Sequence, residues 1–355
     1  LTAAHLLAGV DADLISVHFE DESLKHAYTY SATQSLIFED YDQPNANGDL
    51  AILWMDQTAS EEISRFNIYH DQIHAGDDFL MAGFGLNGTG ALGNDVATTP
   101  VKMKAYNTFD WNSKNFSPAF KDTITWTPLE DAIWAADFDN GLVAQDNLGY
   151  WSGVEHLGLN RQEGMIAAGD SGGPALINGQ LAGVASYVAS LPAGSNETDV
   201  DGAVNSSYGE VGFWQNINYY EQWLDQTVRN QLPDPPESPN EVEMSISEGD
   251  SGTNYVYFMV NFNGDRTLVD GALELDYKTL DGTAVAGEDY IAVSGTLVFY
   301  ENDSQITIPV EVIGDHKAEA DETFYLEVFN PKGASFEDDV VSLIAHRTII
   351  DDDIA

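Results

Sequence analysis

Residues 169–174 read Gly-Asp-Ser-Gly-Gly-Pro and lead into an apolar pair, Ala175 and Leu176. The glycines around Ser171 allow the backbone to take a positive φ and to bring its N–H groups close to a substrate carbonyl. A serine on such a tight turn has the surroundings that a nucleophile requires. The alternative interpretation is an ordinary turn that leads into a strand. Other motifs in the chain are needed to distinguish between a nucleophile turn and an ordinary turn.

The sequence also contains candidates for the other two members of a catalytic triad. Residues 1–5 read LTAAH, and residues 47–53 read NGDLAIL, in which Asp49 precedes an apolar strand. Taken singly, a histidine is usually structural, and an aspartate before a strand usually forms a turn. Taken together in the order His5, Asp49, Ser171, the three motifs resemble those of the chymotrypsin-like (trypsin-fold) serine proteases.

This resemblance implies a role for each residue. Ser171 would attack the scissile carbonyl, His5 would take the proton and return it to the leaving amine, and Asp49 would hold the imidazole tautomer. The backbone N–H groups of Gly169 and Ser171 would form the oxyanion hole. Asp170 would hold the nucleophile loop in its active shape.

The family's usual partner for Asp170 is the amine of the mature N-terminus. Leu1 lies four residues before His5 and cannot be that amine. We therefore expect the family's first segment, with the first strand pair of the N-terminal barrel, to precede the sequence given.

The resemblance also implies a substrate pocket. Met165 stands six residues before the nucleophile, where a carboxylate would select Lys or Arg, so the thioether argues against trypsin-like cleavage. Ser186, Tyr187 and Val188 replace a Ser-aromatic-Gly wall, and Val188 would narrow the pocket, while Gly212 leaves another wall open. We expect a small or medium apolar residue at the cleavage site. Plain core packing is the alternative for Met165.

Composition limits the partners. The 355 residues include 59 acidic and 13 basic side chains, a formal net charge of −46, which opposes binding to nucleic acid or anionic membranes. The absence of cysteine excludes a thiol nucleophile and a disulfide framework. No apolar run approaches the roughly 20 residues of a membrane span. We expect protein or peptide substrates and a secreted, extracellular protein, bacterial and from a marine or salt-rich setting, with possible further domains outside this fragment.

Four prolines within residues 233–239 predict a stiff linker. The chain is accordingly divided into a trypsin-like protease domain at 1–230, a linker at 231–240 and a second domain at 241–355. Apolar residues at helical spacing predict a helix over 217–224. Short alternating segments elsewhere predict an all-β fold, a chymotrypsin-like double β-barrel with its N-terminal segment missing, followed by an immunoglobulin-like sandwich. The expected strands lie at 14–19, 27–30, 50–55, 79–85, 101–106, 123–126, 179–187, 256–260, 273–277, 295–299, 306–312 and 323–329.

Acidic motifs recur through the second domain. SEG at 247–249, DGTA at 281–284 with GEDY at 287–290, GD at 314–315 with EADE at 319–322, and DDD at 351–353 resemble the Calx-beta domain. The resemblance implies structural Ca²⁺ bound by carboxylate oxygens. Gly314 stands where the family sometimes has an acid, so one site is expected to be weaker. A solvated acidic rim is the alternative, although consecutive aspartates repel one another without a cation. The candidate ligands are Glu248, Asp281, Asp315, Glu319, Glu322, Asp351, Asp352 and Asp353.

The sequence therefore predicts a serine endopeptidase joined to a calcium-binding accessory domain, with no cofactor for catalysis. One alternative is a catalytically silent protease homologue that serves as a calcium-stiffened binding or adhesion module. In another, the calcium domain is the functional part and the protease processes only its own chain.

Overall fold

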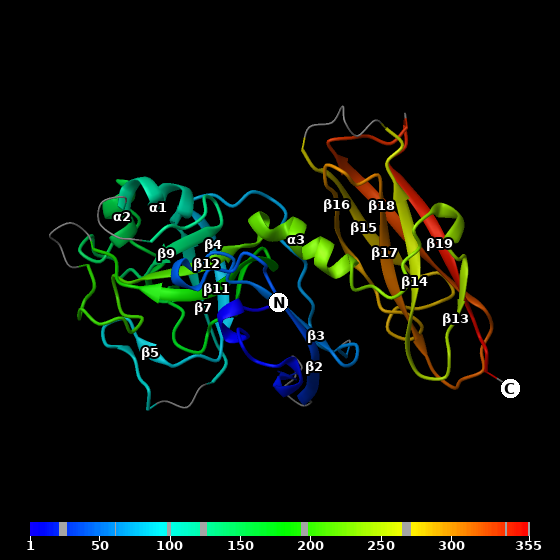
Figure 1. Cartoon of the computed structure of the whole chain (residues 1–355), viewed down its shortest axis with the longest axis horizontal. Coiled ribbons are helices and arrows are strands. Elements are labelled where there is room, and N and C mark those ends of the chain that lie inside the picture. Colours follow the sequence, from blue (N-terminus) through cyan, green and yellow to red (C-terminus); the bar gives the residue numbers. More distant parts are fainter. Residues whose placement is uncertain are drawn as a thin grey trace. The chain divides into compact units, whose positions relative to one another are not determined.

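The computed structural model describes residues 1–20, 27–60, 62–97, 101–120, 126–192, 198–264, 271–337 and 339–353. The chain divides into two compact units (Figure 1). The first unit comprises Leu1–Ala59 and Ile63–Trp223, and the second comprises Ser60–Glu62 and Leu224–Ala355. The division lies within helix α3 (Ile217–Arg229), a few residues before the proline-rich stretch.

The first unit contains two larger antiparallel sheets. β1 (Ser16–Glu20), β2 (Ala27–Ile37) and β3 (Ala51–Met55) form the smaller one. The larger has the order β7-β4-β10-β11-β12-β9-β8. Its strands are β4 (Asp77–Gly83), β7 (Met103–Phe109), β8 (Trp111–Asn112), β9 (Ile133–Asp137), β10 (Pro174–Ile177), β11 (Gln180–Ala189) and β12 (Val211–Asn216), and a separate ribbon pairs β5 (Gly88–Thr89) with β6 (Gly93–Asn94).

The larger sheet curls so that β7, at one edge, meets β9, near the other. Asn107 Nδ2 on β7 donates to the carbonyl of Asp137 on β9 at 2.9 Å, and this bond marks the seam of the barrel. Aromatic rings fill the interior: Phe79 stacks on Phe109 with ring centroids 4.1 Å apart, and Trp214 meets Phe79 edge-on at 4.9 Å. Such pairs stabilise a core beyond the area that they bury.

Helices are short and few in the described residues. They are α1 (Ser113–Phe120), α2 (Asn147–Ser152), α3 and the 3₁₀ turns η1 (Ala4–Leu6), η2 (Ala12–Leu14), η3 (Gln43–Asn45), η4 (Asn160–Gln162) and η5 (Pro239–Glu241). On α3, Ile217, Tyr220 and Leu224 are buried at positions i, i+3 and i+7, as the amphipathic pattern predicts. None of these helices combines the length and the apolar character that a membrane-spanning helix needs.

The second unit is a β-sandwich. One sheet has the order β13-β19-β18-β15-β16, in which β13 runs parallel to β19, and the other pairs β14 with β17 (Figure 1). Apolar side chains such as Phe258, Val310 and Phe324 form the core. The strands are β13 (Ser245–Ser247), β14 (Gly252–Asn261), β15 (Leu273–Leu280), β16 (Ser294–Phe299), β17 (Gln305–Gly314), β18 (Glu322–Lys332) and β19 (Ser342–Ile350).

These sheets confirm the prediction of an all-β chain with a barrel-type region followed by a sandwich. The details differ in places. Helices α1 and α2 were not predicted, and neither was β19, whose residues Leu343 and Ile344 are exposed and break the alternating pattern. The strand expected at 123–126 lies largely outside the described residues. The proline-rich stretch packs on the second unit, since the hydroxyl of Tyr257 donates to the carbonyl of Pro233.

Candidate functional site

His5 and Asp49 are brought together by a short piece of β-ladder. Thr2 and Ala51 exchange backbone hydrogen bonds of 2.9 and 2.8 Å, which fixes the turn carrying His5 against the start of β3. His5 Nδ1 then lies 2.7 Å from Asp49 Oδ2, and the backbone N–H of His5 donates to Asp49 Oδ1 at 2.8 Å. This bidentate contact fixes the imidazole in position and leaves Nε2 as the ring nitrogen not bound to Asp49.

Asp49 is 2% exposed and accepts a third hydrogen bond, from the hydroxyl of Ser186 on β11. Burial by itself raises the pKa of Asp49, but the hydrogen bonds from His5 and Ser186 together hold that pKa below its ordinary value. The hydrogen bond to Asp49 in turn raises the pKa of His5. The pair therefore has the electrostatics of an ionised carboxylate that stabilises an imidazolium.

Ser171 lies on the turn directly before β10. Its hydroxyl donates to the carbonyl of Ser186 at 3.4 Å, and no hydrogen bond to His5 is formed in the part of the chain that the structure describes. The turn packs against the segment before His5: a Cβ at Gly172, whose φ is +81°, would lie 2.2 Å from Thr2 Oγ1. Ser171, Ser186, Asp49 and His5 thus form one connected chain of polar groups.

The backbone of this turn presents free donors. Gly169 has a φ of +99°, and the N–H groups of Gly169 and Ser171 donate to no protein acceptor among the described residues. The N–H of Asp170 between them is used within the turn, by the carbonyl of Ala167 at 2.9 Å. The carboxylate of Asp170 accepts from the N–H of Gly85 at 2.7 Å and from that of Ala167 at 2.9 Å, which ties the turn to the end of β4.

A cavity of about 500 Å³ lies beside His5 and Asp49. Of the five predicted pocket residues, Ser186 and Tyr187 line it. Sequence patterns did not indicate its aromatic walls, because these come from separate segments that only the fold brings together. The further aromatic side chains are Tyr41, Trp126 and Phe213, the last stacked on Tyr187 with centroids 4.5 Å apart.

The other predicted pocket residues form a second group. Val188 pairs with Gly212 across β11 and β12, and a Cβ at Gly212 would lie 2.6 Å from Met165 Sδ. Met165 and Val188 also pack on the barrel core, in line with the packing interpretation of Met165. Met165 lines a separate cavity of about 590 Å³, on the side of the nucleophile turn where Asp170 lies.

Acidic groups converge at one end of the sandwich. Glu248, Asp315 and Asp353 each offer a carboxylate oxygen within 4.8 Å of the others. Glu248 Oε1 and Asp353 Oδ2 are buried and have no hydrogen-bond partner in the described chain. Burial, followed by repulsion from Asp315 and the terminal aspartates, raises the pKa of Glu248 to about 7. Unpartnered carboxylate oxygens are hard ligands, so these residues fit Ca²⁺.

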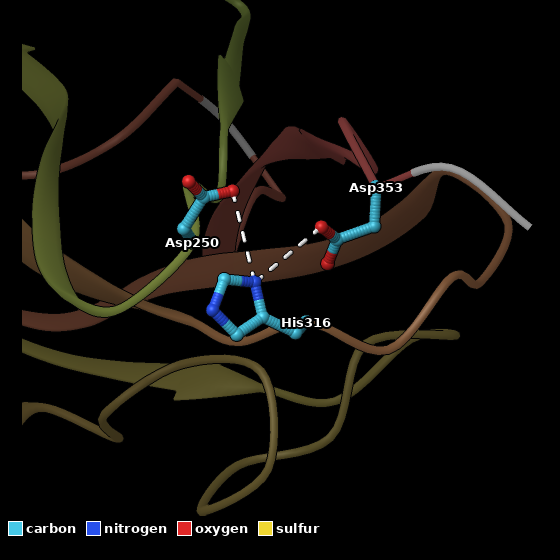
Figure 2. Close-up of side chains that lie close together, drawn as sticks. All are labelled: Asp250, His316 and Asp353. Atoms are coloured by element: carbon cyan, nitrogen blue, oxygen red, sulfur yellow. Dashed lines mark ion pairs between the residues drawn. The ribbon is translucent and has the colours of Figure 1, made fainter.

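His316 lies beside this group. Its Nδ1 is 3.8 Å from an oxygen of Asp250 and 3.8 Å from one of Asp353 (Figure 2). The sequence indicated no partner for this histidine, because Asp250 and Asp353 are far from it along the chain. All three side chains meet where β14, β17 and the end of β19 come together.

The remaining predicted ligands differ in their surroundings. Asp351 accepts from the N–H of Glu319 at 2.6 Å, and Asp352 from the N–H of Gly249 at 3.2 Å. Burial and then Asp289 raise the pKa of Glu322 to about 7. Among the described residues, Asp281 does not belong to this group. Its Oδ1 accepts from the hydroxyl of Tyr290 at 2.7 Å and from the N–H of Ala286 at 2.9 Å.

The presence of glycine in place of an acidic residue at position 314 has a steric explanation. A Cβ there would lie 2.3 Å from the carbonyl oxygen of Gly249 and 2.7 Å from that of Glu248. An acidic side chain therefore has no room at this position.

Sequence analysis also missed a buried acidic cluster in the first unit, formed by Asp137, Asp139 and Asp146. A signal was available in part, since residues two apart in an extended chain share a face, and Asp137 and Asp139 lie two apart at the end of β9. The third member comes from a loop that no pattern marks.

Comparison with known proteins finds curated relatives that match part of this chain. The Drosophila melanogaster "Sodium/calcium exchanger Calx" is 40% identical over 82 residues, and the Homo sapiens "Sodium/calcium exchanger 2" is 37% identical over 94 residues. Each match covers 23% of this chain and only 8% and 10% of the respective relative, so the chain spans about a tenth of their length or less.

Two solved structures are also similar. The mouse-brain serine protease neuropsin covers 64% of this chain and 83% of its own, at 15% identity and a TM-score of 0.43. The apo form of the Calx CBD1 domain covers 32% of this chain and 94% of its own, at 30% identity and a TM-score of 0.27. The family model of the Calx-beta domain matches residues 241–353, and this part of the chain is a Calx-beta domain.

Proposed function

We propose that the chain is a serine endopeptidase whose first unit cleaves peptide bonds and whose Calx-beta domain binds Ca²⁺. The observation that carries the proposal is the buried Asp49 carboxylate, which holds His5 through two hydrogen bonds of 2.7 and 2.8 Å. A carboxylate that fixes an imidazole beside a serine on a glycine-rich turn is the arrangement that acyl transfer requires.

The chemistry follows from the positions of these groups. His5 Nε2 takes the proton of the Ser171 hydroxyl while Oγ attacks the carbonyl carbon. Asp49 stabilises the imidazolium that forms. The unused N–H groups of Gly169 and Ser171 receive the negative oxygen, and each such donor is worth about 3–4 kcal/mol. His5 then gives its proton to the leaving amine, and a water molecule hydrolyses the acyl-enzyme by the same route.

The substrate class follows from the cavity walls. Tyr187, Phe213 and Trp126 provide an aromatic, apolar surface beside His5. Met165, at the position where a carboxylate would select a basic residue, packs on the barrel core instead of lining this cavity. We propose cleavage next to small or medium apolar residues. The net charge of −46 supports export into a salt-rich medium, where screening weakens the repulsion between acidic side chains.

The Calx-beta domain has a structural role in this proposal. Ca²⁺ held by Glu248, Asp315 and Asp353 supplies the positive charge that lets these crowded carboxylates ionise together. Chelation is expected to destabilise this domain and to leave the chemistry of the triad intact.

The test compares wild type with Ser171→Ala, and with Ser16→Ala as a control that removes an exposed hydroxyl. We expect wild type and Ser16→Ala to react with a fluorophosphonate and to cleave members of a peptide library. Ser171→Ala should fail to label and should lose about 10⁶-fold in kcat. Equal turnover in Ser171→Ala and wild type would contradict the proposal.

A second candidate function is a catalytically silent binding module. It is favoured by the hydroxyl of Ser171, which donates to the carbonyl of Ser186 instead of to His5. Triad hydrogen bonds are often long in proteins without substrate, so we place this candidate second. Equal inertness of wild type and Ser171→Ala, with both folded, would establish it in place of the protease.

A further inference from the structure

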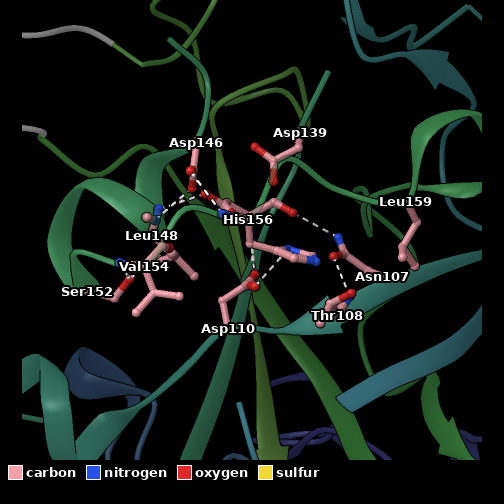
Figure 3. A network of polar contacts seen from close by, with 12 residues as sticks. Asn107, Thr108, Asp110, Asp139, Asp146, Leu148, Ser152, Val154, His156 and Leu159 are labelled. Atoms are coloured by element: carbon pink, nitrogen blue, oxygen red, sulfur yellow. Dashed lines mark hydrogen bonds and ion pairs between the residues drawn. The ribbon is translucent and has the colours of Figure 1, made fainter. Parts of the chain in front are cut away.

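Three aspartates meet inside the first unit, away from His5 and Ser171. Asp137 ends β9, Asp139 follows two residues later, and Asp146 precedes α2. One carboxylate oxygen from each lies within 4.8 Å of the other two. The residues are 1%, 3% and 3% exposed, so solvent contributes little to stabilising their charge. Figure 3 shows Asp139 and Asp146 gathered with Asp110 around His156.

Two of the oxygens have no partner. Asp137 Oδ2 accepts from the N–H of Leu148 at 2.6 Å, but Asp137 Oδ1 is buried without a hydrogen bond in the described chain. Asp139 Oδ1 is buried and unpartnered in the same way. Both oxygens of Asp146 accept a backbone N–H and each keeps a second lone pair. An unpartnered buried carboxylate is costly, so the unpartnered oxygens of Asp137 and Asp139 point to a bound ligand.

Further acidic side chains surround the three aspartates and add to the repulsion between their carboxylates. Asp110 and Glu163 lie next to the three aspartates, and Glu163 Oε1 accepts from the N–H of Asp139 at 2.5 Å. Burial and then these neighbours raise the pKa of Asp139 to about 9. Among the described ion pairs, no lysine or arginine reaches the group, and the one cationic candidate, His156, is bound to Asp110 at 3.1 Å.

We propose that Asp137, Asp139 and Asp146 bind a calcium ion within the first unit. Hard carboxylate oxygens are the ligands that Ca²⁺ prefers, and ligands at about 2.3–2.6 Å from one ion are separated by at most about 5 Å, as these are. Backbone carbonyls and water complete the six to eight ligands that the ion takes. Zinc is disfavoured because the unpartnered atoms are all oxygens and the nearby histidine nitrogen is already bound to Asp110.

The ion has a clear structural task. It joins the end of β9 at the barrel seam to the loop that leads into α2. Glu163, bonded to Asp139, is two residues before Met165 and eight before Ser171. Calcium at this point would therefore hold the base of the chain segment that carries the nucleophile turn. The inference concerns cation binding and stands whether or not the chain is a protease.

Terbium(III), a luminescent substitute for Ca²⁺, provides a test on the full chain. All seven tryptophans lie within residues 1–223, and Trp134 and Trp151 belong to the elements that carry the aspartates. Tryptophan excitation will therefore sensitise terbium bound in the first unit. Asp139→Asn is the chosen variant, because the side chain of Asp139 takes part in no hydrogen bond among the described residues and the amide is isosteric with the carboxylate. The matched control is the double variant Glu248→Gln, Asp353→Asn in the Calx-beta domain.

We expect tryptophan-sensitised emission from wild type and from the double variant, displaced by excess Ca²⁺ in both. In Asp139→Asn, the affinity measured by this emission should fall about tenfold or more, since one charged ligand is lost. Equilibrium dialysis at low Ca²⁺ should find one ion fewer in Asp139→Asn than in wild type. Emission that is absent from folded wild type, or that is unchanged in Asp139→Asn, would overturn the proposal.

Discussion

Asp49 and Asp139 lie in the same unit and are almost equally buried, at 2% and 3% exposed, yet their surroundings differ. Asp49 accepts three hydrogen bonds, two from His5 and one from Ser186, and its pKa is lowered. Asp139 has an oxygen without a partner and acidic neighbours, and its pKa is raised to about 9. The supply of donors, more than burial, decides which carboxylate remains ionised.

The difference also separates two uses of a buried aspartate. Asp49 acts on a neighbouring side chain and needs nothing added to the protein. Asp139 requires either a proton or a cation, and its two acidic companions make a divalent cation the better match. Substitutions that remove the charge from one or the other should therefore have opposite signatures in activity and in calcium dependence.

The largest effect is expected from Asp49→Asn. The carboxylate of Asp49 accepts a hydrogen bond from His5 at each of its two oxygens, whereas the amide of asparagine has only one acceptor oxygen. When the amide nitrogen faces the ring, the imidazole adopts the wrong tautomer, and kcat is expected to fall by about 10⁴. Steady-state kinetics on a peptide ester would measure it, with exposed Asp13→Asn as the control. A loss of less than tenfold in a folded protein would contradict the role given to Asp49.

The second-largest effect is expected on the stability that Ca²⁺ gives the first unit against unfolding. Tryptophan fluorescence reports the first unit alone, because the second unit contains no tryptophan. With Ca²⁺ at about 100 times its Kd, binding should stabilise this unit by about 2.7 kcal/mol, which raises its Tm by roughly 5–10 °C. The increase should persist in Asp49→Asn and fall to about half or less in Asp139→Asn, whose affinity for Ca²⁺ is expected to be at least tenfold weaker. An equal increase in all three proteins would remove the distinction between the two aspartates.

A smaller effect is expected from Ser186→Ala. The change removes one of the donors to the buried Asp49, so kcat/KM should fall about tenfold. In the Asp49→Asn background the same change should have little further effect, because the two residues act through one interaction. Additive losses in the double variant would show that Ser186 acts independently of Asp49.

The smallest effect is expected on the pH at which His5 titrates. The hydrogen bond to Asp49 raises the pKa of His5 above 6.5, and the general base must be neutral, so kcat/KM should fall as the pH drops through this raised value. Removing the carboxylate removes the cause of the increase. The NMR titration of His5 should therefore move to lower pH in Asp49→Asn, and a shift to higher pH would contradict this electrostatic account.

Short-range sequence patterns predicted the elements that carry a strong local signal. Alternation over 306–312 and the helical spacing at 217–224 correspond to β17 and α3. The Calx-beta domain, which was predicted from acidic motifs in a fixed order, is confirmed over 241–353. The roles of His5, Asp49 and Ser171 stay predictions, and the structure adds that the first two are hydrogen-bonded.

Features that depend on distant contacts could not be predicted in this way. The acidic cluster requires the closure of the barrel, which joins Asn107 to Asp137, and a loop that brings Asp146 back to the same point. The aromatic cavity likewise combines Tyr41, Trp126 and Phe213 from three separate segments. Local sequence patterns carry no information about contacts between segments that are distant in the sequence.

The contact between Gly172 and Thr2 has a consequence for how this sequence can change. The space for a side chain at 172 is taken by the hydroxyl of Thr2, 2.2 Å from where a Cβ would lie, and φ at 172 is +81°. Two constraints therefore act on position 172: its positive φ favours glycine whatever its neighbours are, and a side chain would also require Thr2 to move or to be replaced by a smaller residue. Across homologues, glycine should persist at this position, and an exception should be accompanied by a smaller residue at position 2.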